Sequence, residues 1–226
     1  MSLFNIDNTI NVDSGTPRLK ANEIHKVQLK EIKAEDLKGK DSKEYKVIYL
    51  KFQNVDGSIY EQRFFCPSST EAVVAGSFGD QPSDLTQFRY TIQHMIEAIN
   101  PNLYKQILEG KKFEIKTWDE MRRFVVKAFT PGVGVDISLK LLADNKGYAT
   151  IPKYPVSITK NGDLYMSTRF IANEEQSAEK PLIFTDKEKK KMVIQEKVLT
   201  SQPSSVSNID FNKGAAVPKT DDDFDI

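Results

Sequence analysis

Alternating apolar and polar residues predict strands in the first part of the chain. In residues 24–32 the alternation sets Val27 and Leu29 against Lys26, Gln28 and Lys30, as expected for a strand with one buried face. The next stretch, residues 31–43, is charged and contains glycine, so we expect a turn region there.

Residues 44–53 and 58–66 predict a β-hairpin because Asp56-Gly57 separates two runs rich in β-branched and aromatic residues. A two-residue turn would pair Val55 with Ser58. That register gives one aromatic but half-polar face, made of Tyr45, Val47, Tyr49, Lys51, Gln53, Tyr60, Gln62 and Phe64. The other face, which we expect to enter the core, holds Ile48, Leu50, Phe52, Ile59 and Phe65.

After Pro67 the hydrophobic period changes from two residues to that of a helix. Ser83 is a suitable N-cap for a helix reaching about residue 99. Pro101 predicts the start of a second helix, which Gly110 ends. Thr117 and Glu120 form a capping box that predicts a third helix, to about residue 129.

Strand patterns return after these helices. They cover residues 135–142, residues 148–154, and a second hairpin, 156–159 with 164–171, that turns at Asn161-Gly162. Further along, Thr185 and Glu188 form another potential capping box. Four lysines accompany it, Lys187, Lys189, Lys190 and Lys191, and we interpret them as a solvated helix face.

These elements predict a mainly β protein with a helical insertion (α+β). The order favours a five-stranded barrel with helices between the third and fourth strands. We expect an N-terminal arm (1–20), a barrel domain (21–172) with its insertion (67–132), an extension (173–198), and a disordered linker with a tail (199–226).

The scarcity of cysteine and histidine excludes several kinds of site. Cys66 is the single cysteine, so no intramolecular disulfide can form, and with only His25 and His94 a Cys/His zinc site is not expected. No catalytic motif or phosphate loop is present, and we expect no metal, no cofactor and no enzymatic activity. No apolar run is long enough to cross a bilayer, which favours a cytoplasmic protein without a membrane partner.

Charge is distributed unevenly along the chain, although its net value is zero. Residues 199–226 contain two Lys and five Asp, a net charge of −3, which leaves +3 on residues 1–198. The final residues are Asp221, Asp222, Asp223, Phe224, Asp225 and Ile226. A mildly basic body with an acidic tip suggests an anionic partner that the tip imitates.

Aromatic residues interleaved with lysines on strands suggest which anion this is. Unpaired bases stack on aromatic rings, and neighbouring cations neutralise the phosphates. The candidate single-strand-binding residues are Tyr45, Tyr49, Lys51, Tyr60, Phe64, Lys140, Tyr148, Lys153, Tyr154 and Tyr165. For each one taken alone, ordinary packing explains the residue equally well.

The order of elements over residues 20–172 resembles the oligonucleotide-binding (OB) fold. Together with the acidic tip, the chain is similar to phage-type single-stranded-DNA-binding proteins, although it lacks the terminal Pro-Phe of the bacterial forms. The resemblance implies a body that coats single strands in DNA replication, recombination or repair. It also implies a tail that recruits replication proteins and competes with DNA for the body.

Two alternatives remain open: a metal-dependent nuclease or another nucleic-acid enzyme, and a virion-associated protein-interaction module. The sequence does not decide between DNA and RNA, because both offer bases and phosphates. It also leaves self-association into a homo-oligomer open.

Overall fold

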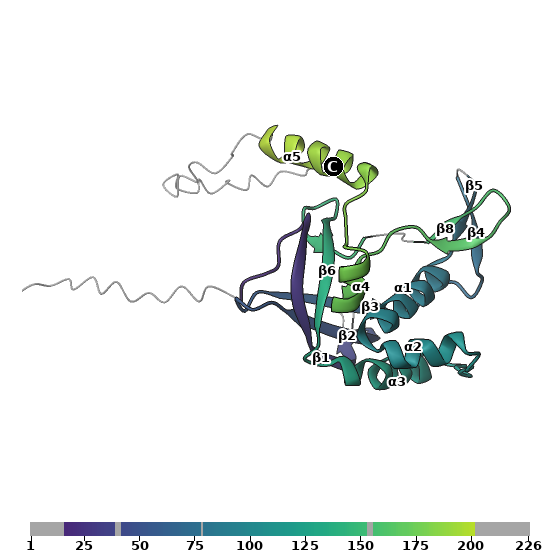
Figure 1. The fold of residues 1–226 in the computed structure, drawn as a ribbon. Coiled ribbons are helices and arrows are strands. Elements are labelled where there is room, and N and C mark those ends of the chain that lie inside the picture. The colour runs from purple at the N-terminus through teal and green to yellow at the C-terminus, as the bar shows by residue number, and fades with distance from the viewer. Residues whose placement is uncertain (1–15, 39–41, 78, 153–155, 202–226) are drawn as a thin grey trace, which may run out of the picture.

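The fold is known from a computed structural model that describes residues 16–38, 42–77, 79–152 and 156–201. A curled antiparallel sheet organises it (Figure 1). The sheet runs in the order β10-β6-β1-β2-β3, with strands β10 (Ile171–Asn173), β6 (Asp136–Ala143), β1 (Glu23–Lys38), β2 (Glu44–Gln53) and β3 (Ile59–Phe65). The short β7 (Ala149–Thr150) also pairs with β6.

Strand β1 joins the two halves of the sheet. Its first residues pair with β6, from Glu23 opposite Leu141 to Gln28 opposite Asp136, and from Gln28 onward it pairs with β2. The register shifts between Leu29 and Glu31. Such a bulge bends the strand and increases its twist, so the sheet curls into a half-barrel.

Three helices connect β3 to β6, as the sequence predicted. They are α1 (Asp84–Ile99), α2 (Pro101–Leu108) and α3 (Trp118–Phe129), and the short 3-10 turn η1 (Thr130–Gly132) follows them. The same connection also contains a hairpin that the sequence did not reveal, β4 (Val73–Gly76) with β5 (Gly79–Pro82). A further hairpin, β8 (Val156–Ile158) with β9 (Leu164–Met166), confirms the turn predicted at Asn161-Gly162.

The predicted helix caps are confirmed. The Ser83 side chain accepts a hydrogen bond from the Thr86 amide at the start of α1, and Thr117 and Glu120 form a complete capping box on α3. After β10 the chain forms α4 (Glu174–Glu179) and α5 (Asp186–Ser201). Helix α5 begins with the predicted box, in which Thr185 and Glu188 exchange hydrogen bonds of 2.7 and 3.2 Å.

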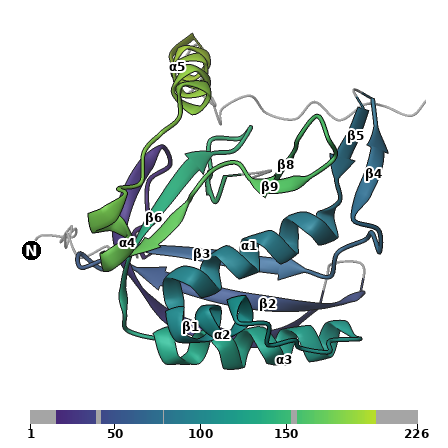
Figure 2. The same cartoon turned by 45° about the vertical axis from the view of Figure 1, so that its right-hand side comes forward.

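The core lies between the inner face of the sheet and the helices. Leu29, Leu50, Leu139 and Leu141 are completely buried in it, together with Met95 of α1 and Phe129 of α3. In Figure 2, α1 crosses the sheet and α3 lies below it. Helices α1 and α3 therefore leave the opposite, outer face of the sheet uncovered.

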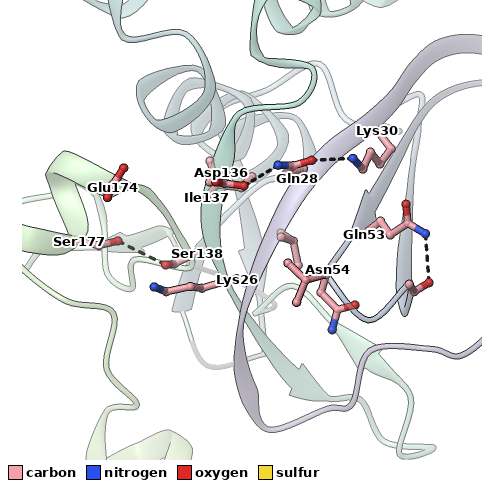
Figure 3. A pocket seen from close by; sticks show the side chains of 13 residues that line it. Lys26, Gln28, Lys30, Gln53, Asn54, Asp136, Ile137, Ser138, Glu174 and Ser177 are labelled. Atoms are coloured by element: carbon pink, nitrogen blue, oxygen red, sulfur yellow. Dashed lines mark hydrogen bonds between the residues drawn. The ribbon is translucent and has the colours of Figure 1, made fainter.

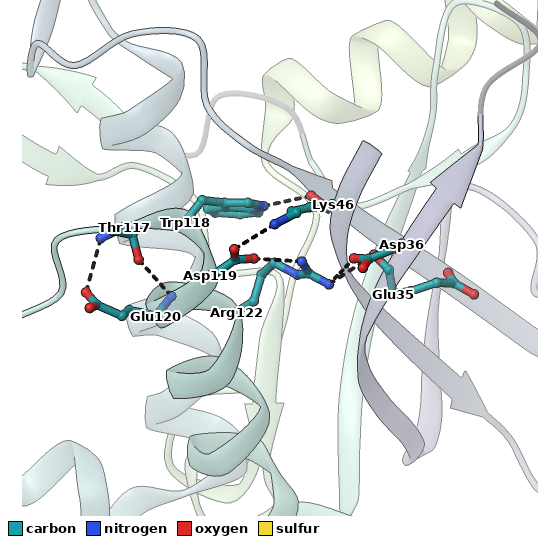
Figure 4. Close-up of polar contacts among 8 residues, drawn as sticks. All are labelled: Glu35, Asp36, Lys46, Thr117, Trp118, Asp119, Glu120 and Arg122. Carbon is teal, nitrogen blue, oxygen red and sulfur yellow. Dashed lines mark hydrogen bonds and ion pairs between the residues drawn. The ribbon is translucent and has the colours of Figure 1, made fainter. Parts of the chain in front are cut away.

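Helix α3 is fastened to the sheet by a buried cation (Figure 4). The Arg122 guanidinium donates to Asp36 at 2.5 Å and to Asp119 at 2.9 Å. The Trp118 indole donates to the Lys46 carbonyl oxygen at 2.7 Å. These contacts hold the first turn of α3 against the ends of β1 and β2.

The first strand is longer than predicted. The prediction of a turn region over residues 31–43 is wrong for its first eight residues, which continue β1 to Lys38 and pair with β2. Their charges are compatible with a strand because one face of this ladder points away from the core.

The predicted hairpin register is also wrong, by one residue. Gln53 pairs with Ile59, and Phe52 with Tyr60, so three residues form the turn instead of two. Gly57 adopts a left-handed conformation with φ of 89°, and the Asn54 amide donates to the Ser58 carbonyl at 3.0 Å. A one-residue shift moves every side chain of one strand to the other face, so Tyr60 and Phe64 point inward and Phe65 outward.

The predicted barrel does not close. In the described residues, β3 has one sheet partner, β2, and no ladder joins it to β6 or β7. The Tyr60 hydroxyl instead accepts a single hydrogen bond from the Ile151 amide, at 3.1 Å. At the same end of β3, residues of the expected N-terminal arm pack alongside the strand, where the Leu19 amide donates to the Ile59 carbonyl at 2.9 Å.

Candidate nucleic-acid interface

A groove crosses the outer face of the sheet (Figure 3). Its floor is formed by β1 and β6, through Lys26, Gln28, Asp136 and Ser138. One wall is α4, whose Ser177 hydroxyl lies 3.4 Å from that of Ser138. The other wall is the β2–β3 turn, with Gln53, Asn54, Val55 and Gly57, and the volume is about 470 Å³.

The groove carries hydrogen-bonding groups and no net charge. Lys26 and Lys30 are balanced by Asp136 and Glu174. The Gln28 amide donates to Asp136 at 2.7 Å and accepts from Lys30 at 2.6 Å. Since a lysine can only donate and a carboxylate can only accept, this amide is held in one orientation.

The middle of the outer face is occupied by a charge-balanced cluster around Tyr49. Lys33 and Arg63 lie over its ring, 4.7 and 4.8 Å from the centroid. Its hydroxyl donates to Glu61 at 2.6 Å. Burial and this hydrogen bond raise the pKa of the Tyr49 phenol. Because cations already cover the ring, Tyr49 offers no free surface on which a base could stack.

An exposed aromatic pair lies at the far end of the same hairpin. Tyr45 of β2 and Phe65 of β3 are 38% and 52% exposed. Their ring centroids are 6.0 Å apart and their planes meet at 85°, the edge-to-face arrangement that aromatic rings prefer. Tyr45, Val47 and Tyr49 are alternate residues of β2 and therefore lie on one face of the sheet. Phe65 pairs with Val47 and shares that face, so Tyr45 and Phe65 both project from the outer face.

Lys140 does not lie on an open surface, contrary to our expectation. It is 1% exposed. Its ammonium lies 3.0 Å from both carboxylate oxygens of Glu188 and donates to the Ile183 carbonyl oxygen at 3.0 Å. The segment leading into α5 therefore covers this part of the outer face.

The structure does not bring the other predicted residues into one surface. Tyr60 is 7% exposed; its hydroxyl donates to Gln62 at 2.7 Å, and burial raises its pKa to about 12. Phe64 packs against Phe88 of α1. Lys51 is half-buried beside Glu61 on the outer face. Tyr148 and Tyr165 are exposed, on the β6–β7 turn and on β9. Lys153, Tyr154 and the acidic tail, residues 221–226, lie outside the described residues.

Sequence reasoning missed most of the groove. The alternation of Lys26, Gln28 and Lys30 against Val27 and Leu29 was visible, and it correctly indicates one polar face. That face contains no aromatic residue, so the pattern of aromatic residues with lysines did not include it. The walls could not be foreseen, since α4 and the hairpin turn meet β1 and β6 only in the folded sheet.

The described residues bring no three His, Cys, Asp or Glu side chains together where they could hold a metal ion. None of the helices in this part of the chain has the length and apolarity of a membrane span. Compared with known protein families, curated proteins and solved structures, the chain has no significant match.

Proposed function

We propose that the protein binds single-stranded nucleic acid, with DNA as its ligand, along the outer face of the half-barrel. The observation that carries the proposal is the combination of an open polar groove at one end of the β2–β3 hairpin and an exposed aromatic pair at the other. A protein that binds single-stranded nucleic acid uses both features: hydrogen-bonding and cationic groups contact the backbone, and aromatic rings stack with the bases.

The distance between these two features suits an extended single strand of nucleic acid. From Gln53, beside the groove, to Tyr45 is eight residues of β2, or roughly 26 Å at about 3.3 Å per residue. Bases could stack on Tyr45 and Phe65 while the backbone enters the groove at Lys26 and Lys30. The cluster around Tyr49 lies between them, and there Lys33 and Arg63 would have to exchange carboxylate partners for phosphates.

The arrangement of the strands also favours this proposal. A long, bulged first strand pairs with both the second strand and the first strand after the helices, which is the pairing expected in an OB fold. We propose that the half-barrel is an open variant of that fold. This would place its ligand on the outer face, over β2 and β3.

We further propose that the acidic tail competes with the ligand and recruits replication proteins. Clustered aspartates resemble phosphates, and tethering to the body gives them an effective concentration on the order of millimolar. Deleting residues 220–226 should therefore tighten DNA binding, most clearly at low salt. An unchanged or lower affinity would refute the competition.

The decisive test is fluorescence anisotropy with a labelled oligo-dT at low salt, with duplex DNA as competitor. We expect binding to the single strand that duplex displaces poorly. The K26Q/K30Q variant should bind more weakly. A matched variant, K105Q/K111Q, changes two exposed lysines of α2 and the turn after it and should bind normally. Absence of oligo-dT binding by the wild-type protein would refute the proposed function.

A further inference from the structure

Helix α5 presents a concentrated positive charge. Lys187, Lys189, Lys190 and Lys191 are all exposed, and in the described part of the chain none of their ammonium groups has an ion-pair partner. The two acidic residues of this stretch are Asp186 and Glu188, and Glu188 is neutralised by Lys140. Residues 186–191 carry four lysines against two acidic residues, a net charge of +2, and +3 when Lys140, the partner of Glu188, is counted with them.

The first turn of α5 is fixed in place by a buried contact. Glu188 uses one carboxylate both to cap the helix, accepting from the Thr185 amide at 2.7 Å, and to bind Lys140. The Lys140 ammonium also lies 5.7 Å from the centroid of the Phe184 ring. These contacts, which we call the Lys140 latch, hold the lysine run against β6. An exposed lysine helix on a free tether would have no defined position.

The latch places the lysine run next to the groove. Lys140 and Ser138 are two residues apart on β6, so they share a face and lie roughly 7 Å apart along the strand. Ser138 belongs to the groove floor, and α4, which precedes this segment, forms a groove wall. Lys187 and Lys191 are separated by one helical turn and therefore lie on the same side of α5, beside Glu188.

The groove itself lacks the charge that phosphates require. Lys26 and Lys30 are offset by Asp136 and Glu174, so hydrogen bonding accounts for its binding capacity. A nucleic-acid strand that left the groove past Ser138 and α4 would meet the four exposed lysines at the start of α5. Counterion release there would supply the affinity that the neutral groove does not.

We propose that the lysine run of α5, residues 187–191, is a phosphate-binding extension of the groove. Its ligand is the phosphodiester backbone of the single strand as it leaves the sheet. Lys140 and Glu188 are positioning residues that set the place of the run and do not themselves touch the ligand. This inference rests on the proposed function and adds a second surface to it.

The test measures how the affinity for oligo-dT, about thirty nucleotides long, depends on salt. Each phosphate contact to a single strand contributes about 0.7 to the slope of log affinity against log salt. The variant K187Q/K189Q/K190Q/K191Q should therefore lose about 1.4 to 2.8 from that slope, corresponding to two to four contacts. The control K105Q/K111Q/K112Q/K116Q removes equal charge from exposed lysines around α2 and α3 and should lose less than about 0.7.

The outcomes separate the two proposals. If the wild-type protein does not bind oligo-dT, the proposed function and this inference both fail. If the wild-type protein binds and the α5 variant keeps its slope, or loses no more than the control, the inference alone fails. The latch is tested by E188Q, which removes the carboxylate that binds the buried Lys140 ammonium and retains all four lysines of the run, so that a smaller slope cannot come from lost positive charge. We expect a smaller slope in this variant too, and an unchanged slope would refute the positioning role.

Discussion

The Lys140 ammonium and the Glu188 carboxylate form an almost buried ion pair, with both carboxylate oxygens 3.0 Å from the nitrogen. Their side chains are 1% and 11% exposed. The pair joins the outer face of β6 to the first turn of α5, residues 48 positions apart in the sequence. Removing one member leaves the other charged and buried, which destabilises the folded state. Replacing both members by apolar groups often leaves its stability nearly unchanged.

We therefore expect K140M and E188M each to lower the free energy of unfolding by about 3 kcal/mol. The double variant K140M/E188M should recover much of that loss, apart from about 1 kcal/mol for the lost helix cap. Urea denaturation followed by circular dichroism would measure this. As a control, Lys26→Met changes an exposed lysine and should stay within about 0.5 kcal/mol of wild type. Additive losses in the double variant would contradict the coupling.

Lys140 also shows how far the sequence could lead. Alternation correctly predicted that Lys140 would share the outer face with Ser138 and not the core. The sequence could not show that a glutamate 48 residues later would cover it, because that contact depends on the path of the chain through β10 and α4. Local signals performed better: the Ser83, Thr117 and Thr185 caps each depend on residues within three positions, and all three predictions are confirmed.

The hairpin turn depends on the backbone of Gly57. Its φ of 89° costs an L-residue with a Cβ roughly 1–2 kcal/mol, and the position is otherwise open, with the nearest atom to a Cβ being Gln53 Nε2 at 4.0 Å. Gly57→Ala should therefore lower stability by about that amount. Gly57→Asn should lower it less, since asparagine tolerates left-handed backbone. Thermal unfolding of the two variants would compare them, and equal loss in both would argue against a conformational cause.

This turn is where the sequence misled us most. Asp56-Gly57 fits a two-residue turn and also the three-residue turn with glycine in the left-handed position that the structure contains. The two turns differ by one residue in register. The difference decides whether Tyr60 or Phe65 reaches the outer face. Burial would have distinguished them, but both strands carry aromatic residues on both faces, so the hydrophobic pattern gave no answer.

A second buried contact predicts how stability depends on pH. The His94 ring, buried on α1, lies 3.3 Å from the Glu97 carboxylate, and Arg169 donates to the same carboxylate at 3.3 Å. The hydrogen bond from His94 lowers the pKa of Glu97 below its ordinary value of 4.5. A group whose pKa is lower in the folded state stabilises the fold above its unfolded pKa, and this contribution disappears as pH falls through the folded value.

We expect wild-type stability to decrease as pH falls below about 4.5, and Glu97→Gln to reduce the size of that decrease. Urea midpoints at pH 7 and pH 3 would measure it. Glu114→Gln changes a glutamate that is 86% exposed and should leave the decrease unchanged. If Glu97→Gln and Glu114→Gln behave alike, the Glu97 contact does not contribute to acid stability.

The exposed aromatic pair gives the sharpest test of the proposed binding face. A base stacked on an aromatic side chain contributes about 1–3 kcal/mol, so Tyr45→Ala and Phe65→Ala should each weaken oligo-dT binding by roughly 5- to 150-fold. Tyr148→Ala removes a still more exposed ring, 70% exposed, from the β6–β7 turn and should have little effect. Tyr49→Phe keeps the ring that Lys33 and Arg63 already cover and should also bind normally. Affinity measured by anisotropy at one fixed salt concentration would rank the four variants. If Tyr148→Ala weakened binding while Tyr45→Ala and Phe65→Ala did not, the bases would contact the β6–β7 turn, and the outer face of the hairpin would not be the binding surface.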